Sequence, residues 1–185
     1  MTAPVILITR AFAFAARRHV DQRRKGERAE PYVNHLAEVA ELVAEASGGE
    51  DPVLVAAAIL HDVVEDTPTS LEEVARRFGP QVAELVAEVT DDTALPSAER
   101  KRRQLARAPE LSSRARRIKI ADKISNLRAL RTSPPRGWDE ARKAAYLSWS
   151  RAVVDALRGT DPRLERAFDE EAKALAQALG CDPAP

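Results

Sequence analysis

The chain has 185 residues, enough for one domain with a real hydrophobic core. Its 29 basic and 29 acidic residues cancel, so no overall positive field attracts nucleic acid, and the balance favours a small-molecule substrate. Cys181 is the single cysteine, so an internal disulfide is excluded. We therefore expect a reducing compartment, with the cytoplasm as the default.

Apolar residues recur every three or four positions along almost the whole chain, and strand-like alternation is absent, so the fold is predicted to be all-α. The first segment is apolar but contains Arg10 and runs into Arg17 and Arg18, which indicates an amphipathic helix rather than a signal peptide or membrane span. No gap between segments is long enough for an interdomain linker, so a single domain over residues 1–185 is expected. About nine helices without a sheet are predicted, at residues 4–19, 32–47, 52–66, 70–78, 80–91, 97–108, 112–131, 138–158 and 162–179.

Two histidines and two aspartates occur in runs that suit one metal site. His35 ends the run PYVNH (31–35), His61 and Asp62 begin HDVVED (61–66), and Asp122 lies in KIADK (119–123). Two imidazoles and two carboxylates form a mixed nitrogen and oxygen donor set that suits Mn²⁺, with Fe²⁺ or Zn²⁺ as less favoured ions. Taken alone, His35 fits a core histidine, because it is in step with the apolar stripe of its helix. The joint occurrence of these residues favours the metal site.

Glu65 and Asp66 are candidates for proton transfer beside that metal. They follow His61 and Asp62 by four residues each, so one helix over 52–66 would stack each pair on one face. Phosphoester cleavage expels a poor leaving group, and a protonated acid nearby lowers its barrier. Negative neighbours should raise at least one of the two carboxyl pKa values, without assigning the proton to one residue. The alternative is that both acids only face solvent at an exposed helix end. The helix dipole disfavours this alternative, because negative charges are unfavourable at a helix C-terminus.

Substrate contacts must come from side chains, because the 7 glycines are scattered and no glycine-rich phosphate loop occurs. Arg24 and Lys25 precede the helix of His35 and could reach phosphates, a solvated basic loop being the alternative. Asn126 is four residues after Asp122 and shares its helix face, where its amide could contact ribose or phosphate. The alternative for Asn126 is a structural role in the interior. The basic run 100–103 stays unassigned, because such runs are usually solvated.

Together these motifs resemble the hydrolase half of the RelA/SpoT alarmone enzymes. The runs RRK (23–25), FG (78–79), VTDD (89–92) and ISNLR (124–128) add to the three already quoted. The resemblance covers roughly residues 10 to 160 and is closest to the stand-alone small alarmone hydrolases, metazoan members included, which lack a synthetase domain. It implies an HD-type helical domain around a metal site, with Mn²⁺ as the metal. It also favours Arg24 and Lys25 as substrate contacts, and it suggests that Arg142 and Tyr146 close the nucleotide pocket.

The resemblance implies hydrolysis of guanosine tetraphosphate or pentaphosphate, (p)ppGpp, to GDP or GTP and pyrophosphate. The chain departs from the residues usual in this family at two positions, Ser97 and Ser125, and both departures bear on nucleotide preference. One alternative is a phosphatase acting on another nucleotide, such as the 2′-phosphate of NADPH. The other is a non-catalytic nucleotide sensor, against which the intact pair of Glu65 and Asp66 argues. The expected partner is a small guanosine nucleotide, without nucleic acid or membrane, and an oligomer is compatible with the sequence.

Overall fold

The computed structural model describes residues 3–180, and this part of the chain is all-α, as predicted. Two isolated β-bridges are its only extended pairings. No helix among the described residues has the length and apolar character needed to cross a membrane. Cys181 lies outside the described residues. The helices are α1 (Pro4–Arg18), α2 (Val33–Ala46), α3 (Pro52–Leu60), α4 (Val63–Asp66), α5 (Leu71–Phe78), α6 (Pro80–Val89), α7 (Ser97–Arg107), the short 3₁₀ helix η1 (Ala108–Glu110), α8 (Ser113–Thr132), α9 (Glu140–Asp155) and α10 (Pro162–Ala178).

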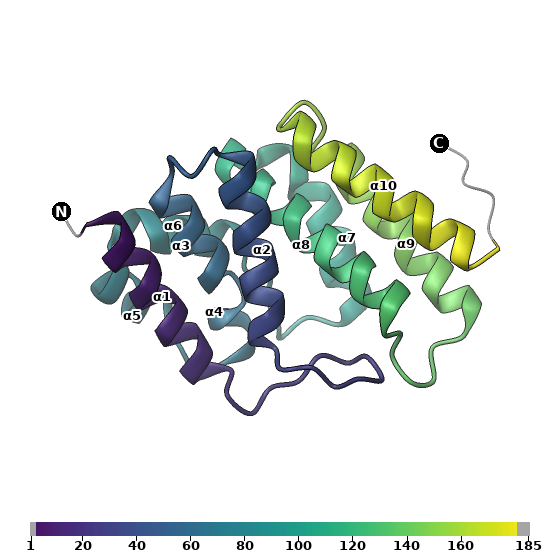
Figure 1. Cartoon of the computed structure of the whole chain (residues 1–185), viewed down its shortest axis with the longest axis horizontal. Coiled ribbons are helices and arrows are strands. Elements are labelled where there is room, and N and C mark those ends of the chain that lie inside the picture. The colour runs from purple at the N-terminus through teal and green to yellow at the C-terminus, as the bar shows by residue number, and fades with distance from the viewer. Residues whose placement is uncertain (1–2, 181–185) are drawn as a thin grey trace.

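Helix α8 runs through the middle of the bundle and packs against α2, α6, α9 and α10 (Figure 1). The hydroxyl of Ser112 caps its start by accepting a hydrogen bond from the backbone N–H of Ala115 at 3.2 Å. The side chains of Ile118, Ile124 and Leu127 are fully buried against the neighbouring helices. This packing fixes the rotation of α8 and therefore the direction in which its polar side chains point.

Helix α3 is buried on all sides, and every residue from Leu54 to Leu60 belongs to the hydrophobic core. Its start is fixed by Asp51, whose carboxylate accepts a hydrogen bond from the N–H of Leu54 at 3.0 Å, and by Pro52 in the first turn. A helix that is apolar all round belongs in the centre of a domain. Its last turn therefore delivers His61 to the interior of the bundle.

The predicted helix over 52–66 is in fact two helices, because the chain turns at His61 and Asp62. The ring Nδ1 of His61 bonds the carbonyl of Ala58 at 2.7 Å, which satisfies one of the free acceptors at the end of α3. Asp62 has ψ −4°, and α4 begins at the next residue. The backbone N–H of Asp66 still reaches the carbonyl of Asp62 at 2.9 Å. The expected one-turn spacing of Asp62 and Asp66 is thus kept, whereas His61 caps the end of α3 and Glu65 lies in α4, so these two residues do not share one helix.

The loop between α1 and α2 lies against the C-terminal end of α8. Gly26 forms an isolated bridge with Pro135, and a Cβ at this position would lie 2.1 Å from the carbonyl oxygen of Ser133. The backbone N–H of Glu27 also bonds the carbonyl of Pro134 at 3.1 Å. Because only glycine allows this approach, Gly26 holds the basic residues before it beside α8.

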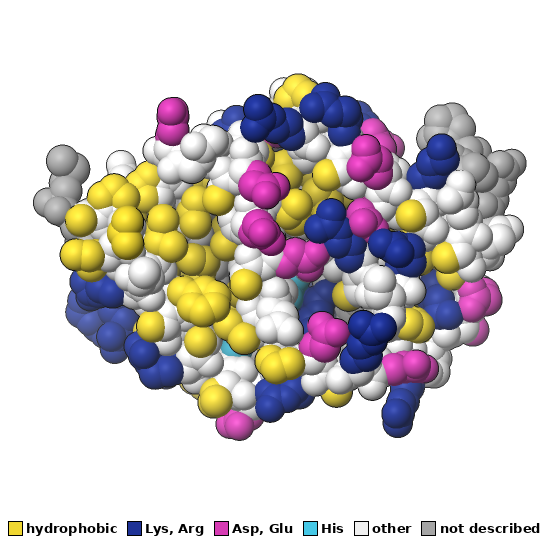
Figure 2. All heavy atoms as spheres, viewed as in Figure 1, with side chains coloured by type: hydrophobic (Ala, Val, Ile, Leu, Met, Phe, Trp, Pro, Cys, Tyr) yellow, Lys and Arg dark blue, Asp and Glu magenta, His cyan; other side chains and the backbone are white. Residues whose placement is uncertain are grey.

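The surface differs from one end of the molecule to the other (Figure 2). Apolar side chains gather over α1, where Val5, Ile6 and Phe12 are exposed. Acidic and basic side chains mix over α2, α8 and α10 on the same face. The charged part of this face therefore lies over the helices that carry His35 and Asp122.

Candidate active site

A cavity of about 430 Å³ opens beside α4 and α8 and collects most of the predicted site residues. Of the eleven, only His35 and Arg142 are absent from its lining. The predicted residues that line it are Arg24, Lys25, His61, Asp62, Glu65, Asp66, Asp122, Asn126 and Tyr146. One concave site thus combines the candidate metal ligands, the acid pair and the basic residues, as a binding site for an anionic small molecule requires.

The candidate metal ligands converge from α2, the α3–α4 turn and α8. His35, His61 and Asp62 each offer a ligand atom, and these atoms all lie within 4.8 Å of one another. The Oδ1 atom of Asp122 lies 3.3 Å from Nε2 of His35 and 3.9 Å from Nε2 of His61. Both histidines are buried. The four residues therefore form one cluster of two imidazoles and two carboxylates, which can hold a divalent metal ion.

The bonding of His61 shows that these residues fit a cation. Its Nδ1 bonds the carbonyl of Ala58, which can only accept, so Nδ1 carries a proton. Its Nε2 is buried and has no hydrogen-bond partner among the described residues, although Oδ2 of Asp62 lies 3.0 Å away. A buried polar atom without a partner is rare, and a metal ion facing it resolves that problem.

Electrostatics also favours a positive charge in the cluster. Burial lowers the pKa of His61, but the charge of Asp62, aided by Asp122, outweighs it and raises that pKa to about 9. For Asp62 the effect of burial has the opposite sign and raises the pKa. The two histidine rings outweigh it and hold the pKa of Asp62 well below its ordinary value. The carboxylates therefore stay ionised and attract a proton or a metal ion to the same place, so metal binding releases protons.

Two further side chains that the sequence argument did not single out hold the aspartates. The hydroxyl of Tyr32 donates to Oδ2 of Asp62 at 2.6 Å, and burial raises the pKa of Tyr32, so it remains a donor. Lys123 is 2% exposed, and its Nζ donates to Oδ2 of Asp122 at 2.9 Å while lying 4.6 Å from the ring centre of Trp149. Lys123 lowers the pKa of Asp122 against the effect of burial. A lysine among the buried apolar positions of α8 was the sequence signal for this role.

The acid pair, Glu65 and Asp66, lines the same cavity as His61, Asp62 and Asp122. Burial and, after it, the charge of Asp91 raise the pKa of Glu65 to about 6. The backbone N–H of Asp91 donates to Glu65 at 3.2 Å, and Arg100 lies 3.5 Å from the other oxygen. The expected rise in one carboxyl pKa is therefore present at Glu65, although burial contributes more than the negative neighbours.

Asp66 is fixed by a chain of side chains from α1 and the loop after it. The amide Nε2 of Gln22 donates to Oδ2 of Asp66 at 2.7 Å. The other end of that amide meets Nδ1 of His19 at 2.5 Å, and His19 stacks on Tyr32 with 5.2 Å between ring centres. These contacts link the two acids to different parts of the chain. Neither His19 nor Gln22 belongs to the motifs quoted for the site.

Basic residues and aromatic rings also line the cavity. Arg24 donates to Oδ1 of Asn126 at 3.0 Å, and Asn126 in turn donates to Oδ1 of Asp122 at 2.7 Å. Asn126 thus connects the candidate metal ligand Asp122 to the basic loop, as its helix position allowed. Lys25 also lines the cavity.

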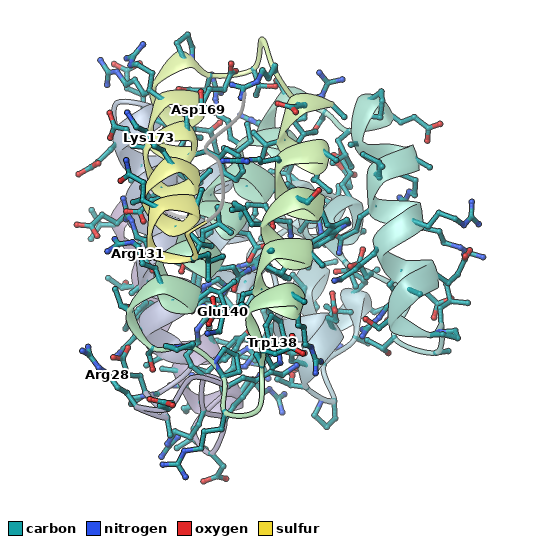
Figure 3. The ribbon with its side chains drawn as sticks, turned by 90° about the vertical axis from the view of Figure 1, so that its right-hand side faces the viewer. Arg28, Arg131, Trp138, Glu140, Asp169 and Lys173 are labelled. Atoms are coloured by element: carbon teal, nitrogen blue, oxygen red, sulfur yellow. The ribbon has the colours of Figure 1, made fainter. Side chains whose placement is uncertain are left out.

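The aromatic wall comes from α9 and from Trp138 in the loop before it. The ring centre of Tyr146 lies 5.8 Å from that of Trp138 and 5.4 Å from that of Trp149. Trp138 lies two residues before α9, close to Glu140 at its first turn (Figure 3). Arg142 does not line the cavity, because its guanidinium covers the ring of Trp138 at 4.5 Å. Its contact with a ligand stays a prediction.

The basic run 100–103 divides into two parts. Arg100 and Lys101 line the cavity, and Nζ of Lys101 lies 4.9 Å from the ring centre of Trp149. Arg102 and Arg103 instead pair with Glu99 at the surface. The solvated interpretation thus holds for half of the run. The other half could not be assigned from sequence, because only the packing of α7 beside α9 brings it to the cavity.

Comparison with known proteins finds close relatives over nearly the whole chain. Residues 11–150 match the family model described as HD domain. The chain is 49% identical over 155 residues to guanosine-3′,5′-bis(diphosphate) 3′-pyrophosphohydrolase MESH1 of Homo sapiens, covering 84% of this chain and 87% of the relative. It is 45% identical to the protein of that name from Xenopus tropicalis, covering 91% and 94%. A solved structure, described as a metazoan ortholog of SpoT that hydrolyzes ppGpp and plays a role in starvation responses, matches with a TM-score of 0.88 and 44% identity, covering 92% of this chain and 96% of its own.

Proposed function

Since the chain belongs to the HD-domain family, and within it to the metazoan SpoT-like small alarmone hydrolases, we propose that it removes pyrophosphate from the 3′ position of guanosine tetraphosphate or pentaphosphate. The observation that carries this proposal is that Glu65 and Asp66 line one cavity together with the His–Asp cluster and several basic residues. A site that only binds a nucleotide has no need of two further acids next to a metal.

We further propose Mn²⁺ as the ion held by His35, His61, Asp62 and Asp122. Their two imidazoles and two carboxylates form a mixed nitrogen and oxygen donor set that suits Mn²⁺ best, with Fe²⁺ or Zn²⁺ second. When bound, such an ion supplies Lewis-acid chemistry, because it withdraws charge from a phosphate oxygen and lowers the pKa of water.

In this reaction the oxygen of a water molecule joins the phosphorus attached to the ribose, and the bond from that phosphorus to O3′ breaks. O3′ needs a proton as pyrophosphate leaves, and water loses one as it attacks. Glu65, with a pKa of about 6, is populated in both protonation states near neutral pH and can give that proton. Asp66, held by Gln22, is placed to share the task. We assign proton transfer to the two carboxyls as a pair.

We propose that the basic and aromatic residues of the cavity bind the nucleotide. Arg24 and Lys25 are proposed to contact the phosphates, with Asn126 placing Arg24 relative to the metal cluster. Tyr146 presents a ring on which a purine can stack. Arg142 is proposed to act by holding Trp138, the neighbouring ring of the aromatic wall.

We also propose that residues 1–185 form a single HD-type domain that acts in the cytoplasm. The family match spans residues 11–150, and α10, which lies beyond it, packs on α8 in the same bundle. A guanosine nucleotide substrate and a lone cysteine both fit a reducing cell interior.

The test is product identification with the metal-loaded protein. Guanosine tetraphosphate and NADPH are supplied separately, and the released species are separated by anion-exchange chromatography. The proposal requires GDP and pyrophosphate in equal amounts from the tetraphosphate. Release of phosphate from NADPH alone would assign the protein to the alternative phosphatase class, and binding of both nucleotides without turnover would make it a sensor.

A further inference from the structure

His35 makes a second contact on the side of its ring that faces away from the cavity. Its Nδ1 lies 2.8 Å from Oγ of Ser125 on α8, and that hydroxyl lies 2.5 Å from Oε2 of Glu38 on α2. Glu38 follows His35 by three residues and so lies on the same face of α2. A histidine, a serine and a carboxylate are thus connected in a row behind the candidate metal cluster.

The donors and acceptors in this row determine where its protons lie. An ionised carboxylate can only accept, so the single hydroxyl proton of Ser125 is donated to Glu38. The oxygen of Ser125 then accepts from His35, which places a proton on Nδ1. A neutral ring with its proton on Nδ1 carries a lone pair on Nε2. That Nε2 faces Oδ2 of Asp62 at 3.5 Å and Oδ1 of Asp122 at 3.3 Å, where three lone-pair donors meet and a cation fits.

Glu38 is itself held in place by a guanidinium group. Its other oxygen accepts from Arg128 of α8 at 3.0 Å, and the same guanidinium pairs with Glu171 of α10 at 3.0 Å. Arg131, at the end of α8, also pairs with Glu171 at 3.1 Å (Figure 3). The row behind His35 is therefore anchored to three helices, α2, α8 and α10, over which acidic and basic side chains mix at the surface (Figure 2).

The two histidines of the cluster differ in how they are oriented. Nδ1 of His61 bonds the backbone carbonyl of Ala58, a contact that no side-chain substitution removes. Nδ1 of His35 depends on the side chain of Ser125 and, through it, on Glu38. The orientation and tautomer of one candidate ligand are thus set by the backbone, and those of the other are set by side chains.

We propose that Ser125 and Glu38 are positioning residues for His35, which fix its ring with the proton on Nδ1 and thereby set the affinity of the cluster for a divalent metal. This inference rests on the metal site of the proposed function but not on the identity of the nucleotide. Loss of a side chain that orients a metal-binding histidine typically weakens metal affinity by about 10- to 100-fold.

The experiment compares Ser125→Ala, Ser125→Thr and Glu38→Gln with the wild-type protein. Mn²⁺ affinity is measured by electron paramagnetic resonance of the free ion, without nucleotide. We expect Ser125→Ala to weaken Mn²⁺ binding by about 10- to 100-fold. Ser125→Thr should bind like the wild type, because it keeps the hydroxyl. Glu38→Gln should fall between them, since its amide oxygen still accepts but the charge is gone.

Glu41→Gln is the matched control, because it makes the same charge change at an exposed position of α2. The melting temperature of each metal-free variant is measured alongside. Long-range proton–nitrogen NMR spectra of the metal-free protein, at a pH high enough to leave the ring neutral, report the tautomer of His35. The wild type and Ser125→Thr should show the proton on Nδ1, and Ser125→Ala should show a mixture.

Unchanged Mn²⁺ affinity in Ser125→Ala would overturn the inference, as would an equal loss of affinity in the Ala and Thr variants together with lower melting temperatures. A wild-type protein that binds no Mn²⁺ would overturn both the inference and the proposed Mn²⁺ site. Normal Mn²⁺ binding without hydrolysis of guanosine tetraphosphate would overturn the proposed substrate alone.

Discussion

Replacement of Lys123 by methionine tests whether Asp122 is held as a buried, charged side chain. Lys123 is 2% exposed, and its Nζ lies 2.9 Å from Oδ2 of Asp122 and 4.6 Å from the ring centre of Trp149. Lys123→Met keeps most of the apolar volume but leaves Asp122 as a buried carboxylate without its ammonium partner. Breaking one side of a buried ion pair costs about 3 to 5 kcal/mol. Because His35 and His61 still face Asp122, we expect the lower end, about 3 kcal/mol.

Urea unfolding of the metal-free protein measures this loss of unfolding free energy. Thermal unfolding should show the same loss as a fall in melting temperature of roughly 6 to 12 °C. Lys143→Met is the matched control, because Lys143 lies 2.8 Å from Glu140, whose side chain is 67% exposed. Such a surface pair contributes less than about 1 kcal/mol. Saturating Mn²⁺ should narrow the gap between Lys123→Met and the wild type, since the ion neutralises Asp122 instead. A Lys123→Met variant as stable as the control, or a gap that widens with Mn²⁺, would refute this reasoning.

Three further predictions concern the ligands, the basic loop and the acid pair. His61→Ala or Asp122→Ala should lose metal and activity together, and metal analysis that finds the wild-type stoichiometry in either variant would remove it from the ligand set. Lys25→Ala should chiefly raise KM for guanosine tetraphosphate, because it removes a phosphate contact made before the transition state, and an unchanged KM would return Lys25 to a solvated loop. The pKa of Glu65 is raised from 4.5 to about 6, so its contribution to stability is present below pH 4.5 and is lost as pH rises through 6. Metal-free Glu65→Gln, which stays neutral, should therefore gain about 1 kcal/mol relative to the wild type between pH 4 and pH 7, after allowance for solvent screening, and parallel stability curves for the two proteins would contradict this.

Much of the candidate site could be predicted, because its residues lie in short runs and their helical spacing can be read from the sequence. His35, His61, Asp62 and Asp122 were predicted as metal ligands from their motif context, and Asn126 as a substrate contact from its spacing to Asp122. The structure brings the four candidate ligands together. The all-α fold follows from the same periodicity, since the apolar stripes bury one face of almost every helix.

The remainder depends on contacts between distant parts of the chain. The turn at His61 ends α3 because the ring bonds the carbonyl of Ala58, and helical periodicity does not report such a bond. Lys101 reaches the cavity only because α7 packs beside α9. The row from His35 through Ser125 to Glu38 joins α2 to α8, and no spacing within either helix indicates that junction.

Turnover by the Glu65→Gln, Asp66→Asn and double variants tests the central claim most directly, because these swaps keep shape while removing proton transfer. The assay determines kcat for guanosine tetraphosphate at saturating Mn²⁺, together with metal content and nucleotide affinity. General acid–base help contributes about 10² to 10⁴ in rate, so at least one single variant should fall by about that factor with metal and nucleotide binding retained. The double variant should fall little further, since the pair shares one task. A double variant with near-wild-type turnover would contradict the account and leave the reaction to the metal ion alone.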